Sequence, residues 1–273
     1  MGHSSMMFIK LEWKQMLRSR WMQMVGLLFT FVFTTIVVIQ QMALPDAQGF
    51  SRQTASFLNL LLFLLPLFIL TIGSMSVASD IESRWLSLLK TYPLTMRHYV
   101  IGKFIATVLA FLLIVAVAFS VVLLLGGFLG GVSLPPVFIG ITLLSILIFA
   151  SLSIVIGVLA KTRLYALALA LVVWSIFLLL ISYGLMALGT VIAGHMLQKI
   201  TVVVIHLNPV EWLRFGYLLF AEQASVLGPS YFDLISFYQT LAGKLTYTLV
   251  TALWISVPLV LARFVVARKG KEA

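Results

Sequence analysis

Phe104–Ala160 reads FIATVLAFLLIVAVAFSVVLLLGGFLGGVSLPPVFIGITLLSILIFASLSIVIGVLA, which is 57 residues without an Asp, Glu, Lys or Arg. One membrane-spanning helix needs roughly 20 apolar residues, so this window is long enough for two. The glycine- and proline-rich segment at its centre, Gly126–Pro136, predicts the turn between them. The window therefore indicates an all-α membrane protein built from long apolar helices.

Four other charge-free windows flank this one: Trp21–Pro45, Gln53–Ser79, Leu164–Gln198 and Leu245–Ala262. Each is long enough for about one span. Together the windows predict six transmembrane helices, at about 21–44, 55–79, 101–125, 136–160, 165–192 and 243–264. We expect one six-span domain over 21–265, after an N-terminal arm (1–20) and before a basic tail (266–273).

The overall composition supports the same class. The chain of 273 residues is 62% hydrophobic and 10% charged, whereas a soluble domain is roughly 45–50% apolar and about 25% charged. Its net charge of +10 would suggest nucleic-acid binding in a soluble protein, but the topology of a membrane protein accounts for it. We expect no nucleic-acid partner. The absence of cysteine excludes disulfides and thiolate metal sites.

The basic residues are distributed unequally between the two sides of the predicted bundle. An even number of spans puts both termini on one side, and that side carries 14 of the 18 lysines and arginines. Because basic residues concentrate in cytoplasmic loops, we expect both termini to be cytoplasmic. The connection between the second and third spans, Ser79–Lys103, then lies on the same side.

The N-terminal arm has the pattern of an amphipathic helix over residues 6–20. Met6, Ile9, Trp13, Met16 and Leu17 share one face, and basic residues flank it. Such a helix lies flat in the membrane interface. The alternative is that the basic arm only sets the orientation of the first span.

The chain shows no means of its own to drive a reaction or a transport step. The phosphate-binding pattern G-x-x-x-x-G-K-[ST] is absent. No charged residue falls in the middle of a predicted span, where proton or ion relays are normally placed, and no catalytic constellation is visible. We therefore expect a protein that is not an enzyme and that receives energy from another polypeptide.

Ser79–Lys103 is the most prominent polar interruption in the first half of the chain. Ser79 and Glu82 fit a capping box that would begin a new helix, and Pro93 would end it. Ile81, Trp85, Leu88 and Leu89 would form one apolar ridge on this helix. The ridge either packs on neighbouring span ends or inserts into a groove of another protein, with Trp85 as the anchor.

The connection between the fifth and sixth spans, about 193–243, predicts short external helices. Asn208 suits the N-cap, Pro209 the first helical position and Glu211 the third, so that Glu211 would reach back to the cap. Trp212, Phe215 and Leu219 would share the apolar face, and a second helix would cover Tyr231–Gln239. These helices either form a structural lid on the spans or present a surface to a substrate or partner.

The order of residues in Ser79–Lys103 resembles the cytoplasmic signature of ABC-2-type transporter permeases. The resemblance covers nearly the whole chain, although Trp85-Leu86 stands where the family usually has Gly-Thr-Leu. It implies that a cytoplasmic ATPase, which binds ATP and Mg, docks on this segment. The candidate coupling residues are Asp80, Glu82, Arg84, Trp85, Leu88, Leu89, Pro93, Arg97, Gly102 and Lys103.

Two stretches resemble the permease of the nitrous-oxide-reductase maturation transporter (the Nos type) in particular: Leu89–Phe104 and Leu207–Arg214. This resemblance implies a homodimer in a bacterial cytoplasmic (inner) membrane, two ATPase subunits and a periplasmic β-helix partner. It also implies a role in supplying copper or sulfur to a copper enzyme. The candidate external residues are Asn208, Pro209, Glu211, Trp212 and Arg214.

Two alternative functions stay open at this point: export of a lipid, peptide or drug by another ABC-2-type transporter, and a membrane assembly scaffold that transports nothing. Because His and Met bind copper, His195, Met196 and His206 are the available metal ligands on the external side. They lack the spacing of a ligand cluster, so we expect this chain to bind no metal or cofactor itself.

Overall fold

The computed structural model describes residues 3–43, 50–85, 95–128, 134–228 and 231–272, and these parts of the chain contain helices and no strands. In these parts of the chain, six helices can span a membrane, and they are those predicted from the charge-free windows, so the protein is an all-α membrane protein. The elements are α1 (His3–Arg18), α2 (Arg20–Ala43), α3 (Phe50–Glu82), α5 (Met96–Phe128), α6 (Pro136–Leu159), α7 (Arg163–Ser175), η1 (Ile176–Leu180), α8 (Ile181–Leu188), α9 (Gly194–Leu207), α10 (Pro209–Phe220), η2 (Ala224–Leu227), α11 (Phe232–Gln239) and α12 (Leu241–Glu272).

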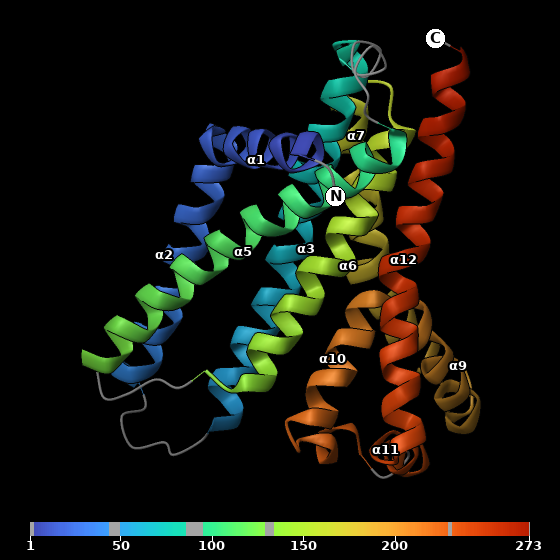
Figure 1. Ribbon diagram of the computed structural model, residues 1–273. Coiled ribbons are helices and arrows are strands. Elements are labelled where there is room, and N and C mark those ends of the chain that lie inside the picture. The colour runs from blue at the N-terminus through green and yellow to red at the C-terminus, as the bar shows by residue number, and fades with distance from the viewer. Residues whose placement is uncertain (1–2, 44–49, 86–94, 129–133, 229–230, 273) are drawn as a thin grey trace.

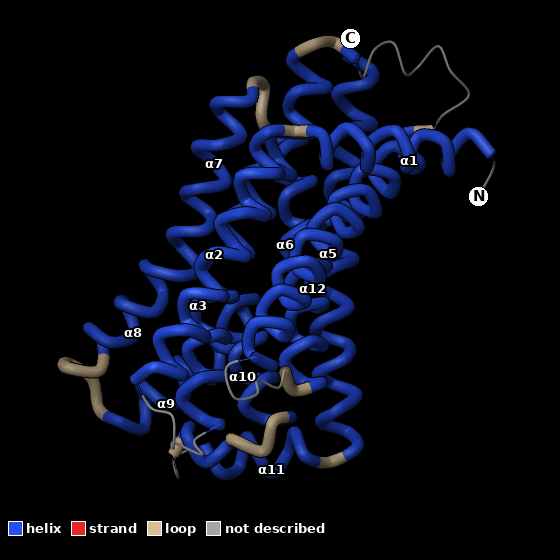
Figure 2. The backbone as a smooth tube through the Cα atoms, turned by 90° about the vertical axis from the view of Figure 1, so that its left-hand side faces the viewer, coloured by secondary structure: helices blue, strands red, loops and turns tan. Residues whose placement is uncertain are grey.

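The spanning helices lie side by side, and α1 crosses one end of the bundle at a steep angle to them (Figure 1). This end, which we call the α1 end, also holds the end of α3, the starts of α5 and α7, and the C-terminus. The opposite end holds α11 and the start of α12, and Figure 2 shows the same division from the side. We call it the α11 end.

Small residues let α3 and α6 approach closely near their C-terminal ends. A Cβ on Gly157 of α6 would lie 2.6 Å from the backbone oxygen of Ser74 and 2.6 Å from the side chain of Val77. Close approach through small residues is a common way for helices to pack in a membrane, where no hydrophobic effect draws them together. Glycine at 157 therefore sets the distance between these two helices.

Aromatic side chains fill the space between α2, α3, α5 and α6. Phe33 of α2 stacks on Phe57 of α3 at 5.5 Å and meets Phe119 of α5 edge-on at 5.9 Å. Phe119 in turn packs against Phe138 of α6, with ring centroids 5.6 Å apart. These ring contacts pack α2, α3, α5 and α6 against one another.

Candidate functional site

The end of α3 differs from the sequence prediction. The helix continues without interruption through Ser79 to Glu82, so the expected capping box does not start a new helix there. The chain instead turns at Ser83 and at Arg84, whose φ is +57°. Trp85 follows this turn and is 40% exposed. The prediction failed because the apolar face of α3 continues past Ser79 through Ile81, which packs against buried neighbours.

The polar groups at this turn bind α7 rather than each other. The Arg163 guanidinium donates to the Ser79 hydroxyl, and the Glu82 carboxylate accepts the Arg163 backbone N–H at 3.0 Å. Arg163 is the first residue of α7, so Glu82 places a negative charge at the N-terminus of that helix, where it is favourable. These hydrogen bonds therefore connect the turn directly to α7, the start of the fifth span.

A buried cluster of charges joins α1, α3 and α5 just inside the α1 end. Lys103 Nζ lies 2.6 Å from Glu12 Oε2 and 2.8 Å from Asp80 Oδ2. Tyr99 donates to Asp80 Oδ2 at 2.7 Å, and Lys103 also donates to Ser76 at 3.2 Å. Two carboxylates thus share one ammonium group, and all three helices are tied to it.

Burial raises the pKa of Glu12 above its usual value, because the charged form loses its hydration. The Lys103 charge and hydrogen bond oppose this shift, and the nearby Asp80 carboxylate adds to it. The Glu12 carboxyl therefore keeps its proton up to a higher pH than an exposed glutamate does.

Glu12 was not among the residues singled out from the sequence. The buried stripe of α1 consists of Phe8, Glu12 and Met16, whereas Met6, which we expected on the apolar face, is 74% exposed. The stripe is rotated because Lys103 supplies a partner for the carboxylate. The available signal was a lone acid in an arm with four basic residues.

Gly102 lies where α1 crosses α5. A Cβ on Gly102 would come within 2.6 Å of the Phe8 ring, so only glycine permits this crossing without a shift. Phe8 also packs against Tyr99, with ring centroids 5.9 Å apart. Gly102 and Lys103 thus hold α1 in place together, the first by its size and the second by its charge.

The candidate coupling residues divide into two sets. Those exposed at the α1 end are Glu82, Arg84, Trp85 and Arg97, and those buried beneath them are Asp80, Gly102 and Lys103. Leu88, Leu89 and Pro93 lie outside the described residues.

The connection between the last two spans forms a helical hairpin that enters the bundle. Figure 1 shows α9 and α10 in the lower half of the view, on either side of α12. The Asn208 side chain at the tip of the hairpin donates to the Phe177 carbonyl at 2.7 Å, and Trp254 donates to the His206 carbonyl at 3.2 Å. Phe177 and Trp254 lie near the middle of their spans, so the hairpin reaches the middle of the predicted membrane.

Asn208 is fully buried and caps α10 as predicted, accepting the Val210 N–H at 3.0 Å. The Phe177 carbonyl that it binds belongs to η1, a π-helical segment. Glu211 does not reach back to the cap, because it accepts from Arg214 at 2.7 Å and from Ser182 at 3.3 Å. The second half of the expected capping box is therefore wrong.

The face of α10 expected to be apolar is inside the fold. Trp212 is fully buried, stacks on Tyr247 of α12 at 4.5 Å, and donates to Thr251 at 2.9 Å. Pro209 is also buried, as are Phe215 and Leu219. The hairpin is a packed part of the bundle, deeper than a helix lying on the outer leaflet.

The three potential metal ligands do not converge. His195 and Met196 are exposed at the start of α9, and His206 is near its end, 11 residues from His195 or about 16 Å along the helix. Both ring nitrogens of His206 have partners, the Val202 carbonyl at 2.7 Å and the Tyr238 hydroxyl at 2.6 Å. The His206 ring therefore positions α11 against the hairpin.

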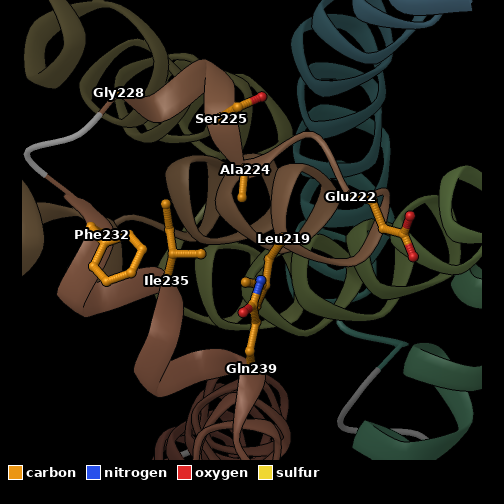
Figure 3. Close-up of a pocket in the computed structure, with 8 residues that line it drawn as sticks. All are labelled: Leu219, Glu222, Ala224, Ser225, Gly228, Phe232, Ile235 and Gln239. Atoms are coloured by element: carbon orange, nitrogen blue, oxygen red, sulfur yellow. The ribbon is translucent and has the colours of Figure 1, made fainter.

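A pocket of about 500 Å³ opens at the α11 end. Figure 3 shows Leu219 and Ala224 near its centre, Phe232 and Ile235 of α11 on one side, and the Glu222 carboxylate on the other. Ser225, Gly228 and Gln239 complete the lining. The pocket is an apolar hollow with one acidic group at its margin.

Comparison with known proteins agrees with this architecture. A family model described as "ABC-2 family transporter protein" matches residues 6–270. The "Probable ABC transporter permease protein NosY" of Pseudomonas aeruginosa is 29% identical over 215 residues, which are 72% of this chain and 75% of the relative. The protein of the same name from Stutzerimonas stutzeri is 29% identical over 209 residues, with the same shares. The chain therefore belongs to the ABC-2 transporter family and is a multi-pass permease subunit of an ABC transporter, similar to these Nos-type permeases.

Proposed function

We propose that this permease passes the motion of a cytoplasmic ATPase from the α3–α5 connection to the α9–α10 hairpin and the outer pocket. The family implies an ATPase partner that binds ATP and Mg. The observation that carries the proposal is the exposed Trp85, placed directly beyond α3 and its buried link to α1 and α5. The excess of basic residues supports a cytoplasmic position for this end.

The α3 helix provides a continuous path for such motion. Its end is fixed to α7 through Arg163 and to α5 and α1 through Lys103. The fifth span, which begins with α7, contains the Phe177 carbonyl that holds the hairpin tip. A displacement at Trp85 would therefore reach the middle of the membrane through helices that are rigid along their axes.

At the other end, we propose that a homodimer of this permease presents its outer pocket to a periplasmic partner, the β-helix protein that the Nos-type resemblance implies. The complex would then deliver copper or sulfur for assembly of the copper site of nitrous oxide reductase. The permease would act by transmitting force to that partner rather than by conducting a metal ion. In agreement with this role, both ring nitrogens of His206 are occupied by hydrogen bonds within the protein.

The ATPase contact is tested by co-purification from mild detergent. Trp85→Ala removes an exposed aromatic anchor, and a residue of that kind contributes about 2 kcal/mol or more at an interface, which corresponds to roughly 30-fold weaker ATPase binding. Glu82→Ala should also weaken binding, although it removes the contact to α7 as well. Lys161→Ala, exposed at the same end, is the matched control. Unchanged ATPase association and ATPase activity in both variants would sink the docking proposal.

The proposed role in copper-site assembly has its own readout. Cells that lack this permease should make nitrous oxide reductase with little copper, and the Trp85→Ala variant should fail to restore it while Lys161→Ala succeeds. Normal copper content without the permease would leave export of another substrate, or a scaffold role, as the better interpretation.

A further inference from the structure

We propose that the outward face of α1 holds the head group of an anionic phospholipid, with Lys14 and Arg18 as its phosphate ligands. The site is a hollow of about 460 Å³ lined by Leu11, Lys14, Gln15, Arg18 and Ser19. Its lining residues lie on α1 and directly after it, outside the buried stripe of Phe8, Glu12 and Met16. The proposal does not depend on which face of the membrane is cytoplasmic.

The charge at this hollow is not neutralised within the protein. Lys10, Lys14 and Arg18 follow one another at four-residue intervals, so they form one exposed row along α1. Among the described residues, no carboxylate comes within ion-pair distance of any of the three. The one acid on this helix, Glu12, points inward to Lys103. The basic side chains of this row are therefore available to bind an external anion.

The chemistry of the hollow suits a lipid better than a free anion. Two cations, an amide and a hydroxyl surround it, and Leu11 adds an apolar wall that is 54% exposed. Two residues beyond Ser19, a row of exposed apolar side chains begins on α2 with Trp21 and Met24, which are 68% and 63% exposed. Tryptophan concentrates at the membrane interface, so the acyl chains would run along α2 from a head group held at the corner.

The depth of α1 also agrees with a head group. The helix crosses the end of the bundle close to the start of α2, where the apolar span begins (Figure 1). An amphipathic helix with basic residues in this position lies at the level of the lipid phosphates. Bound lipid would then stabilise the same helix that the Glu12–Lys103 pair fixes from inside.

The test compares two double variants of equal charge. Lys14→Gln/Arg18→Gln removes both proposed ligands, whereas Lys10→Gln/Arg20→Gln removes two exposed charges of α1 and α2 that do not line the hollow. Binding of phosphatidylglycerol to the detergent-purified permease is measured by native mass spectrometry. Each interfacial basic residue contributes about a fivefold effect on anionic-lipid binding, so we expect roughly a 30-fold loss in the first variant and a much smaller loss in the second.

Two further arms identify the ligand. Phosphatidylcholine should bind more weakly than phosphatidylglycerol, and millimolar inorganic phosphate should not displace the lipid. Equal losses in the two double variants would show a diffuse charge effect and overturn the site, as would displacement by inorganic phosphate. Loss of ATPase co-purification in Lys14→Gln/Arg18→Gln with unchanged lipid binding would also overturn it, and would assign the face to the protein partner instead.

Discussion

Lys103 is the shared cation of the buried charge cluster. It is 2% exposed and neutralises two carboxylates that belong to different helices. Removing the shared cation leaves two negative charges without compensation, whereas removing one carboxylate leaves an intact pair. The cluster should therefore tolerate the loss of one carboxylate better than the loss of the lysine.

Lys103→Met should lower the free energy of unfolding by about 3–5 kcal/mol, because it breaks a buried ion pair on one side only. Glu12→Gln should cost far less, since Lys103 and Asp80 remain paired and the amide still accepts a hydrogen bond. Unfolding of the purified protein by SDS titration measures both. A larger loss in Glu12→Gln than in Lys103→Met would contradict this account, and a Glu12→Gln/Lys103→Met double variant close to Lys103→Met alone would show that Asp80 dominates.

The raised pKa of Glu12 predicts a pH dependence. Between the usual glutamate pKa and the raised one, the folded protein holds a proton that the unfolded chain has lost. Stability rises with pH only where the unfolded state binds more protons, so here the free energy of unfolding should fall as pH rises. The midpoint of unfolding measured across this range should decline in the wild type and be flatter in Glu12→Gln. Parallel pH profiles for the two proteins would show that Glu12 is not the titrating group.

At the scale of the element, α1 is held along the first turns of α5, from Phe8 at Gly102 to Met16, whose sulfur accepts from the Thr107 hydroxyl at 3.8 Å. Phe8 lies on Gly102, and the charge cluster lies one residue further along. Although α1 has the composition of a helix that rests on the membrane, its position relative to the candidate coupling residues is set by protein contacts.

Gly102→Val should displace α1, because the new side chain would overlap the Phe8 ring, and overpacking of this kind typically costs about 1–3 kcal/mol. Phe8→Ala in the same chain should recover part of that loss. Gly127→Val is the matched control, since a Cβ at Gly127 of the same helix α5 meets no atom within 4 Å. Comparable losses at Gly102 and Gly127, or no recovery with Phe8→Ala, would mean that helix propensity rather than the crossing determines the effect.

At the scale of the whole molecule, the two ends of the bundle differ in the features that they present. The α1 end contains the exposed candidate coupling residues, the charge cluster and most of the basic residues, and the α11 end contains the pocket and the open side of the hairpin. The orientation of the bundle therefore decides whether the α1 end can face the proposed cytoplasmic ATPase.

The absence of cysteine allows that orientation to be measured directly, because any introduced thiol is the only one. Ser225→Cys, exposed at the α11 end, should react with a membrane-impermeant maleimide on intact spheroplasts. Ser83→Cys, exposed at the α1 end, should react only after the membrane is permeabilised. The reverse pattern would show that the topology is inverted, and it would contradict docking of the ATPase at the α3–α5 connection.

The sequence by itself determined the class of the protein, its six spans and the unequal division of its basic residues. These features depend on local composition, since each span needs only enough consecutive apolar residues to cross the membrane. The N-cap at Asn208 was predictable for the same reason, because a cap and its helix are neighbours in the chain.

Only the tertiary structure decided the buried face of α1, the continuation of α3 past Ser79 and the depth of the α9–α10 hairpin. Each depends on a partner far away in sequence: Lys103 for Glu12, Arg163 for Glu82 and Phe177 for Asn208. A polar residue in an apolar environment takes whatever partner the packing brings within reach, since an unpaired one is costly there. The local pattern around Glu12 or Glu82 therefore could not show which partner that would be.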